Sequence, residues 1–218
     1  MVVRLRDGET GFLEKFARAC GASEQDSGRI RATVSDILAQ VREKGDRALL
    51  ELTRKFDRLS LDTASLRFSP ERIGKALTAT DPGILEALRL ARDRIWSHHA
   101  RQKPNDHIYT DAQGVSLGIR WTPVDAVGLY VPGGLASYPS SVLMNAIPAK
   151  VAGVERIAMV VPTPDGQVNE AVLSAASIAG VDEIYRVGGA QAIGALAYGT
   201  ESIAPVAKIV GPGNAYVA

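Results

Sequence analysis

Three glycine-rich turns hold the residues of this chain whose types and spacing suit the binding of a ligand. They span residues 131–135, 187–190 and 210–214, and each begins as an apolar run ends. Glycine allows a ligand to approach the backbone closely. A helix that begins just beyond such a turn offers free N–H groups and a partial positive charge to a phosphate. Together the turns indicate a nucleotide or another phosphorylated ligand.

Three polar side chains accompany these turns, and each has a structural interpretation beside a binding one. Tyr130 lies one residue before the end of its apolar run, where it could be a core aromatic residue with a hydrogen-bonded hydroxyl. Gln191 opens a predicted helix, where it could be a solvated first-turn residue, and Asn214 suits the N-cap of a further helix. Short turns also need glycine for geometry alone, and none reads G-x-G-x-x-G. The pattern by itself therefore does not identify a dinucleotide.

Candidates for a metal site or a nucleophile are few. His98 and His99 are adjacent near the end of a predicted helix, so their side chains point about 100° apart and do not easily share a metal. His107 is the third histidine, and Cys20 is the single cysteine, so an internal disulfide is excluded and a reducing compartment fits. We assign no catalytic residue and no metal ligand to this chain.

The elements that must position the turns alternate between strand and helix over residues 122–218. Apolar runs predict strands at 126–131, 156–161, 183–187 and 207–210, with helices at 141–152, 169–179 and 190–198. Strands that alternate with helices predict a parallel sheet. Because ligands bind outside the carboxyl ends of parallel strands, we expect the three turns to share one rim of this sheet.

The preceding residues predict helices followed by a β-hairpin. Apolar residues recur at helical spacing over residues 23–56. Ser69-Pro70 and Asp81-Pro82 each resemble an N-cap followed by proline at the first helical position. The apolar period then becomes two, which predicts a hairpin over residues 108–121.

The predicted fold class is therefore α/β, in two parts. A helical N-terminal region with its β-hairpin occupies residues 1–121, and an incomplete Rossmann-like parallel-sheet domain occupies residues 122–218. Most of the Lys and Arg lie in the first part, whereas the second is rich in glycine and small apolar residues. The chain stops soon after Asn214, where a helix should begin. We therefore expect the N-terminal part of a longer protein, or a shortened piece of one.

Composition excludes several classes of function. Apolar residues make up 46% of the chain and charged residues 22%, as in a folded globular protein. The formal net charge of +1 predicts neither nucleic acid nor a membrane surface as a partner. No apolar run approaches the roughly 18 residues of a membrane span. We expect a soluble intracellular protein.

Ordered segments of the chain resemble the histidinol dehydrogenase family. They are VGLYVPGG (127–134), YPSSVLMNAIPAKVAGV (138–154), GGAQAIGALAYGT (188–200) and KIVGPGN (208–214). EKGDRAL (43–49) and the helix–hairpin layout that follows it are compatible with the same family. The resemblance covers essentially the whole chain but only about half of a typical member.

The resemblance implies an enzyme that oxidises L-histidinol to L-histidine through the aldehyde, in two NAD-dependent steps that end histidine biosynthesis. Members are zinc-dependent cytoplasmic homodimers. The NAD-contacting tyrosine, glutamine and asparagine of the family fall on Tyr130, Gln191 and Asn214. The zinc ligands and the catalytic glutamate–histidine pair are expected beyond residue 218. This chain would then supply the NAD-binding part only and would be inactive by itself.

Two other functions stay open at this point. A relative of the family could oxidise another small alcohol, because the residues that select the substrate are expected outside this segment. The chain could instead be a non-catalytic module for nucleotide binding or oligomerisation. NAD binding that depends on Gln191 and Asn214 would separate cofactor binding from a purely structural role.

Overall fold

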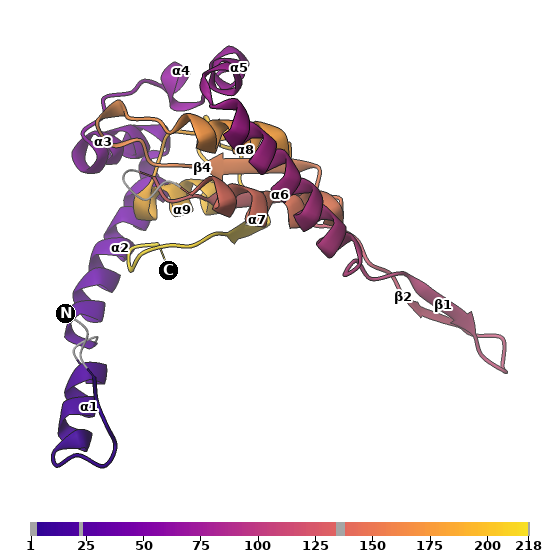
Figure 1. The fold of residues 1–218 in the computed structure, drawn as a ribbon, viewed down its shortest axis with the longest axis horizontal. Helices are drawn as coiled ribbons and strands as arrows, with labels where there is room; N and C mark the ends of the chain where they lie inside the picture. The colour runs from indigo at the N-terminus through magenta and orange to yellow at the C-terminus, as the bar shows by residue number, and fades with distance from the viewer. Residues whose placement is uncertain (1–3, 22–23, 134–137, 218) are drawn as a thin grey trace.

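The computed structural model describes residues 4–21, 24–133 and 138–217 (Figure 1). At its centre the described residues form a parallel sheet in the order β5-β4-β3-β6. The strands are β3 (Ala126–Tyr130), β4 (Arg156–Val160), β5 (Glu183–Tyr185) and β6 (Lys208–Val210). Leu129 of β3 pairs with Met159 of β4 and with Val210 of β6. The carboxyl ends of the strands therefore lie on one rim, as the α/β prediction requires.

Helical layers cover both faces of the sheet, most completely over β3 and β4, whereas β6 at the edge is partly exposed. Successive side chains of each strand point to opposite layers. Val127 and Leu129 belong to a core that contains residues of α7 (Pro139–Ala152) and α8 (Glu170–Ala179). Tyr130 and Val160 belong to a second core, which contains residues of α9 (Gly189–Tyr198). The position of a residue in its strand therefore determines which helical layer its side chain faces, also at the carboxyl rim.

Helices from the first part of the chain complete both layers. α5 (Pro70–Ala79) and α6 (Pro82–Ala100) pack against α8, and α6 also packs against α7. On the other face, α2 (Glu24–Lys44) and α3 (Asp46–Asp57) pack against α9. The short helices α4 (Thr63–Leu66) and η2 (Pro164–Gly166) lie in connecting segments. The division at residues 121 and 122 stays a prediction, but the helices before it share the cores of the sheet.

Two segments project from this body (Figure 1). The predicted hairpin is present as β1 (His107–Thr110) and β2 (Ser116–Ile119), an antiparallel pair whose residues are all exposed. α1 (Phe12–Gly21) lies beyond the N-terminal end of α2, with Leu13 78% exposed. None of the helices in the described residues combines the length and the apolar character that crossing a membrane requires.

Capping residues set the helix boundaries, as the sequence predicts. The Ser69 and Asp81 side chains accept hydrogen bonds from backbone N–H groups in the first turns of α5 and α6, each of which begins with proline. Asn169 caps α8 in the same way, and Gly180 ends that helix with φ of 76°. Some limits differ: α7 begins at Pro139 rather than at residue 141, because proline fits the first helical turn. α4 was not predicted.

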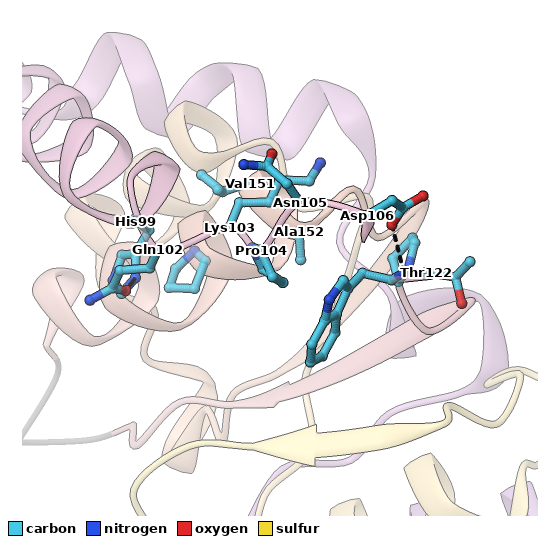
Figure 2. Close-up of a pocket in the computed structure, with 12 residues that line it drawn as sticks. His99, Gln102, Lys103, Pro104, Asn105, Asp106, Thr122, Val151 and Ala152 are labelled. Carbon is cyan, nitrogen blue, oxygen red and sulfur yellow. Dashed lines mark hydrogen bonds between the residues drawn. The ribbon is translucent and has the colours of Figure 1, made fainter. Parts of the chain in front are cut away.

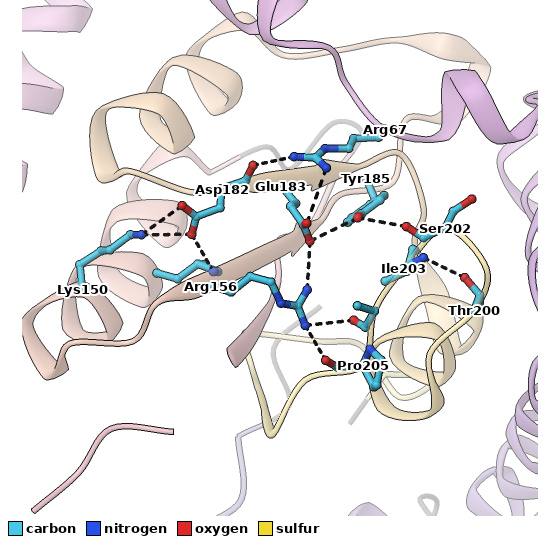
Figure 3. A network of polar contacts seen from close by, with 12 residues as sticks. Arg67, Lys150, Arg156, Asp182, Glu183, Tyr185, Thr200, Ser202, Ile203 and Pro205 are labelled. Atoms are coloured by element: carbon cyan, nitrogen blue, oxygen red, sulfur yellow. Dashed lines mark hydrogen bonds and ion pairs between the residues drawn. The ribbon is translucent and has the colours of Figure 1, made fainter. Parts of the chain in front are cut away.

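Charged residues fasten the amino ends of the strands to the loops around them (Figure 3). Arg156, the first residue of β4, donates to the Glu183 carboxylate at 3.0 Å. The Asp182 carboxylate accepts from the β4 backbone at 2.8 Å and pairs with Lys150 at 3.1 Å. Burial, reinforced by the neighbouring Glu183 carboxylate, raises the pKa of Tyr185 to about 12. Asp182 and Glu183 at this rim are thus matched by donors.

Candidate functional site

The three side chains singled out from the sequence line one cavity of about 460 Å³. Tyr130 is the last residue of β3, Gln191 lies in the first turn of α9 after β5, and Asn214 follows β6. The cavity therefore opens at the carboxyl rim of the sheet. The expectation that these strand-tip turns share a rim is confirmed.

Tyr130 is both a core residue and a wall of the cavity. The residue is 6% exposed and belongs to the core that α9 covers. Its hydroxyl oxygen accepts a hydrogen bond from the Gly189 N–H at 3.2 Å. Burial raises the pKa of this hydroxyl, so it stays protonated at neutral pH. The structural interpretation of Tyr130 is confirmed, and the hydroxyl also ties β3 to the start of α9.

Gln191 is 1% exposed, so its interpretation as a solvated first-turn residue is wrong. The backbone before it is unusual, because Gly189 has φ of +64°. A Cβ at Gly189 would lie 2.7 Å from the Gln191 Oε1 atom. Glycine is therefore required there by both the backbone angle and the buried amide beside it. A buried amide at a cavity wall presents both a donor and an acceptor to a ligand.

Asn214 caps a turn formed by the described residues that follow it. Its Oδ1 accepts from the Tyr216 N–H at 3.0 Å, and its carbonyl oxygen accepts from the Val217 N–H at 2.9 Å. The side chain is exposed at the edge of the cavity. Its capping interpretation therefore holds for a single turn.

The glycines of the turns bring the strand tips close together. A Cβ at Gly188 would overlap the Pro162 side chain, and one at Gly211 would overlap the Tyr130 backbone. Gly211 also has φ of +144°, which other residues rarely adopt. In these two turns glycine meets protein neighbours rather than open space. Residues 134 and 135 of the first turn lie outside the described residues.

The sequence did not predict that helices from residues 1–121 form one wall of this cavity. Thr33 and Ile37 of α2 and Phe56 and Asp57 of α3 line the same cavity. Only tertiary packing brings these helices to the rim, so no local sequence pattern predicts that their residues line the cavity. Asp57 does carry one signal: an acid at the last residue of a helix opposes the helix dipole.

A second cavity of about 580 Å³ lies at the opposite rim, beside the foot of the hairpin (Figure 2). His99 lines it, and its Nδ1 atom lies 2.7 Å from the Oε1 atom of Gln102. His98 Nε2 lies 3.1 Å from the Nε2 atom of the same glutamine. In residues 4–21, 24–133 and 138–217, no three His, Cys, Asp or Glu side chains gather as a metal site needs. The side chain of Cys20 lies outside the described part.

Comparison with known sequences identifies the family. A model of the family described as histidinol dehydrogenase matches residues 21–218. The chain is 60% identical over 218 residues to a histidinol dehydrogenase from Brucella abortus and 58% identical to one from Mesorhizobium japonicum. Each match covers 100% of this chain and 51% of the relative. The chain thus spans about half the length of the curated relatives it matches.

The fold agrees with a solved structure. The crystal structure of histidinol dehydrogenase from Elizabethkingia anophelis is similar, with a TM-score of 0.82 and 36% sequence identity. The match covers 86% of this chain and 43% of that one. On the sequence match over residues 21–218 and on this shared fold, the chain belongs to the histidinol dehydrogenase family.

Proposed function

We propose that this chain supplies the NAD-binding part of an enzyme that oxidises L-histidinol to L-histidine through the aldehyde. The reaction would consist of two successive hydride transfers to NAD, as in the last stage of histidine biosynthesis. One observation carries the proposal. Tyr130, Gln191 and Asn214, the residues that the family resemblance assigns to NAD, come from three separate strand tips and line one cavity.

The chemistry of this cavity suits part of a dinucleotide. Its volume lies within the range of small-molecule sites, roughly 300–1,000 Å³. Aromatic rings, two amides and one carboxylate line it, with neither Lys nor Arg among the described lining residues. Such a surface fits the flat base and the hydroxyls of a nucleoside better than a bare phosphate. NAD, when bound, supplies the hydride acceptor, and this chain would hold and orient it.

Each of the three residues has a distinct task in this proposal. The buried Gln191 amide would donate a hydrogen bond to the ligand and accept one from it. Because the residue is buried, water would not compete for these hydrogen bonds. The Tyr130 hydroxyl, protonated at neutral pH, holds the start of α9 and adds no charge to the site. Asn214 would contribute its amide at the open edge of the cavity, where its side chain is exposed and its Oδ1 atom caps the turn that follows.

The remaining chemistry of the family is not assigned to these residues. The resemblance implies zinc, but the described residues offer no cluster of three metal-binding side chains, and we derive no step through a metal. The zinc ligands and the catalytic pair stay expected beyond residue 218. We therefore expect the purified chain to produce no NADH from histidinol. A cytoplasmic homodimer and L-histidinol as the substrate remain part of the same proposal.

NAD titration of the chain, followed by NMR so that weak binding is visible, tests the cofactor site. Gln191→Ala should weaken NAD affinity about tenfold or more, because a buried hydrogen-bonding group is removed. Gln113→Ala is the matched control, since Gln113 lies exposed in the hairpin turn. Equal NAD affinity of the Gln191 variant and the unmodified chain would contradict the proposal.

A further inference from the structure

We propose that a cavity of about 550 Å³ at the β5 edge of the sheet binds the phosphate group of a small molecule, with the Arg186 guanidinium as its main contact. Arg67, Phe68, Arg72 and Glu170 also line this cavity, which we call the edge cavity. It shares no lining residue with the cavity at the carboxyl rim. The inference therefore does not depend on the proposed binding of NAD.

The edge cavity lies where the segment before α5 runs along the outer strand of the sheet. Arg186 directly follows β5, the edge strand. Its N–H donates to the Leu66 carbonyl oxygen at 2.8 Å, and the Phe68 N–H donates to the Ile184 carbonyl oxygen at 2.9 Å. The first turns of α5 and α8 complete the lining. The backbone of Arg186 is thus held at the cavity wall.

The Arg186 side chain is positioned by the protein, but its charge has no partner there. Its Cζ atom lies 5.2 Å from the centre of the Phe68 ring, and Phe68 is only 5% exposed. This cation–π contact orients the guanidinium and accepts none of its in-plane N–H groups. Nε is buried without a hydrogen-bond partner among the described residues, whereas Nη1 and Nη2 are not buried. Nη1 and Nη2 are therefore the donors available to a ligand.

The other two arginines of the edge cavity do have carboxylate partners. Arg72 donates two hydrogen bonds to the Glu170 carboxylate, at 2.8 and 2.5 Å. Arg67 Nη1 lies 3.6 Å from the Glu183 carboxylate, which also pairs with Arg156 at 3.0 Å (Figure 3). The described lining contains three arginines and one glutamate, a formal surplus of two positive charges. An anionic ligand would balance this surplus.

Electrostatics around Arg186 show why an anion would be favourable there. Burial lowers the pKa of its guanidinium, and the positive charge of Arg72 lowers it further. Arginine nevertheless stays charged at neutral pH, so the folded chain contains two repelling cations beside one cavity. An anion between them would replace this repulsion by attraction and would offset part of the lost hydration of Arg186.

Charge and geometry favour a phosphate over a carboxylate. A phosphate monoester carries about 1.5–2 negative charges at pH 7, which matches the surplus, whereas a carboxylate carries one. Guanidinium groups bind phosphate oxygens through paired N–H donors. The amino ends of α5 and α8, each ten residues long, add partial positive charge. Since small-molecule sites occupy roughly 300–1,000 Å³, the edge cavity has room for an organic group beside the phosphate.

The test is an NMR titration of the 218-residue chain at constant ionic strength, with inorganic phosphate, glycerol 3-phosphate and acetate as probes. Both phosphates should shift the backbone N–H signals of Arg186 and Arg72, and acetate should not do so at the same concentrations. Arg186→Gln should bind phosphate about tenfold more weakly or worse, the loss expected for hydrogen bonds to a charged group. Arg89→Gln, an equal change of charge at an exposed position of α6, is the matched control and should bind phosphate normally.

A second variant covers the case in which Arg186→Gln does not fold. Arg186→Lys keeps a cation beside the Phe68 ring but loses the paired donors, so its phosphate affinity should lie below that of the unmodified chain. Tighter binding of glycerol 3-phosphate than of inorganic phosphate would support a phosphorylated small molecule as the ligand. Equal affinities would contradict that class and would leave a site for free phosphate only.

The remaining outcomes separate the edge cavity from the NAD site. The inference is overturned if phosphate leaves the Arg186 and Arg72 signals unchanged, or if acetate shifts them equally. It is also overturned if the folded Arg186 variants bind phosphate as tightly as the unmodified chain. NAD affinity should be the same in Arg186→Gln and in the unmodified chain. A loss of NAD affinity in that variant would assign Arg186 to the NAD site and would overturn a separate phosphate site, whereas failure of NAD to bind at all would overturn only the proposed function.

Discussion

The two rims of the central sheet differ in whether their charged side chains have partners within the protein. At the amino rim, Arg156 and Glu183 pair with each other, and Asp182 is held by Lys150 and by the β4 backbone. At the carboxyl rim, the buried Oδ2 of Asp57 has no partner among the described residues, although a cavity lies beside it. Polar groups that satisfy one another stabilise a fold, whereas a buried polar group without a partner destabilises it. Each rim has a cavity beside it, so the presence of a cavity alone does not distinguish the two rims.

The largest expected effect is at the amino rim, on stability alone. Glu183→Ala leaves Arg156 without its carboxylate, in a region where the glutamate side chain is only 19% exposed. The free energy of unfolding should fall by about 2–3 kcal/mol, less than for a fully buried pair because water reaches both groups. Urea denaturation measures this change. NAD affinity should stay the same.

Glu155→Ala is the matched control for that substitution, because Glu155 is exposed one residue before β4. It should change stability by less than about 0.5 kcal/mol. A loss of NAD affinity in a folded Glu183→Ala chain would mean that the two rims are coupled. The assignment of the amino rim to stability alone would then be wrong.

At the carboxyl rim, Gly188→Ala should lower both stability and NAD affinity. The added Cβ would overlap the Pro162 side chain, and relief of that overlap must displace the start of α9 and with it Gln191. Overpacking of this kind costs about 1–3 kcal/mol. Gly74→Ala, in α5 with open space around it, should instead stabilise the chain by about 0.5–1 kcal/mol. Unchanged NAD affinity in Gly188→Ala would show that the turn does not position the ligand site.

Much of this contrast could be predicted from the sequence, but only where local chemistry determines the structure. Ser69 and Asp81 mark helix starts because a side-chain oxygen caps the N–H groups next to it. Tyr130, Gln191 and Asn214 could be placed on one rim because the ends of parallel strands must lie side by side. These inferences need no knowledge of long-range packing.

The rest depended on contacts between distant segments. Asp57 reaches the cavity because α3 packs against α9, and Arg58 meets Asp165, far along the chain. No spacing in the sequence encodes these contacts. The burial of Gln191 likewise results from the helices that cover α9. Its position in the first turn of a helix, taken alone, predicts an exposed side chain.

A smaller effect is expected for Tyr130→Phe, which keeps the ring in the core and removes only the hydroxyl. The Gly189 N–H would lose its acceptor, which should lower the free energy of unfolding by about 1 kcal/mol. Tyr198→Phe, exposed at the end of α9, is the control and should leave stability unchanged. Thermal unfolding of both variants measures the difference. An equal stability of the two would show that the Tyr130 hydroxyl does not hold α9.

The smallest effect concerns the pH dependence of stability, and its sign distinguishes two acids near the same rim. Burial raises the pKa of Asp57 above its ordinary value of 3.8, so between those two values the folded chain binds more protons than the unfolded chain. Its contribution to stability therefore falls as the pH rises through this window. Asp57→Asn removes this pH-dependent loss of stability. The variant should therefore gain stability relative to the unmodified chain as the pH rises from below about 4.

Asp165 should behave in the opposite way, although it lies in the turn to which the end of α3 is fastened. The hydrogen bond from Arg58 lowers the pKa of Asp165, so its contribution is present above the ordinary pKa and is lost as the pH falls through the lowered value. Asp165→Asn should thus lose stability relative to the unmodified chain at neutral pH and recover it in acid. Urea denaturation across this pH range measures both differences. If the two variants showed the same sign, Asp57 would have a protein partner after all, and the contrast between the rims would lose its main support.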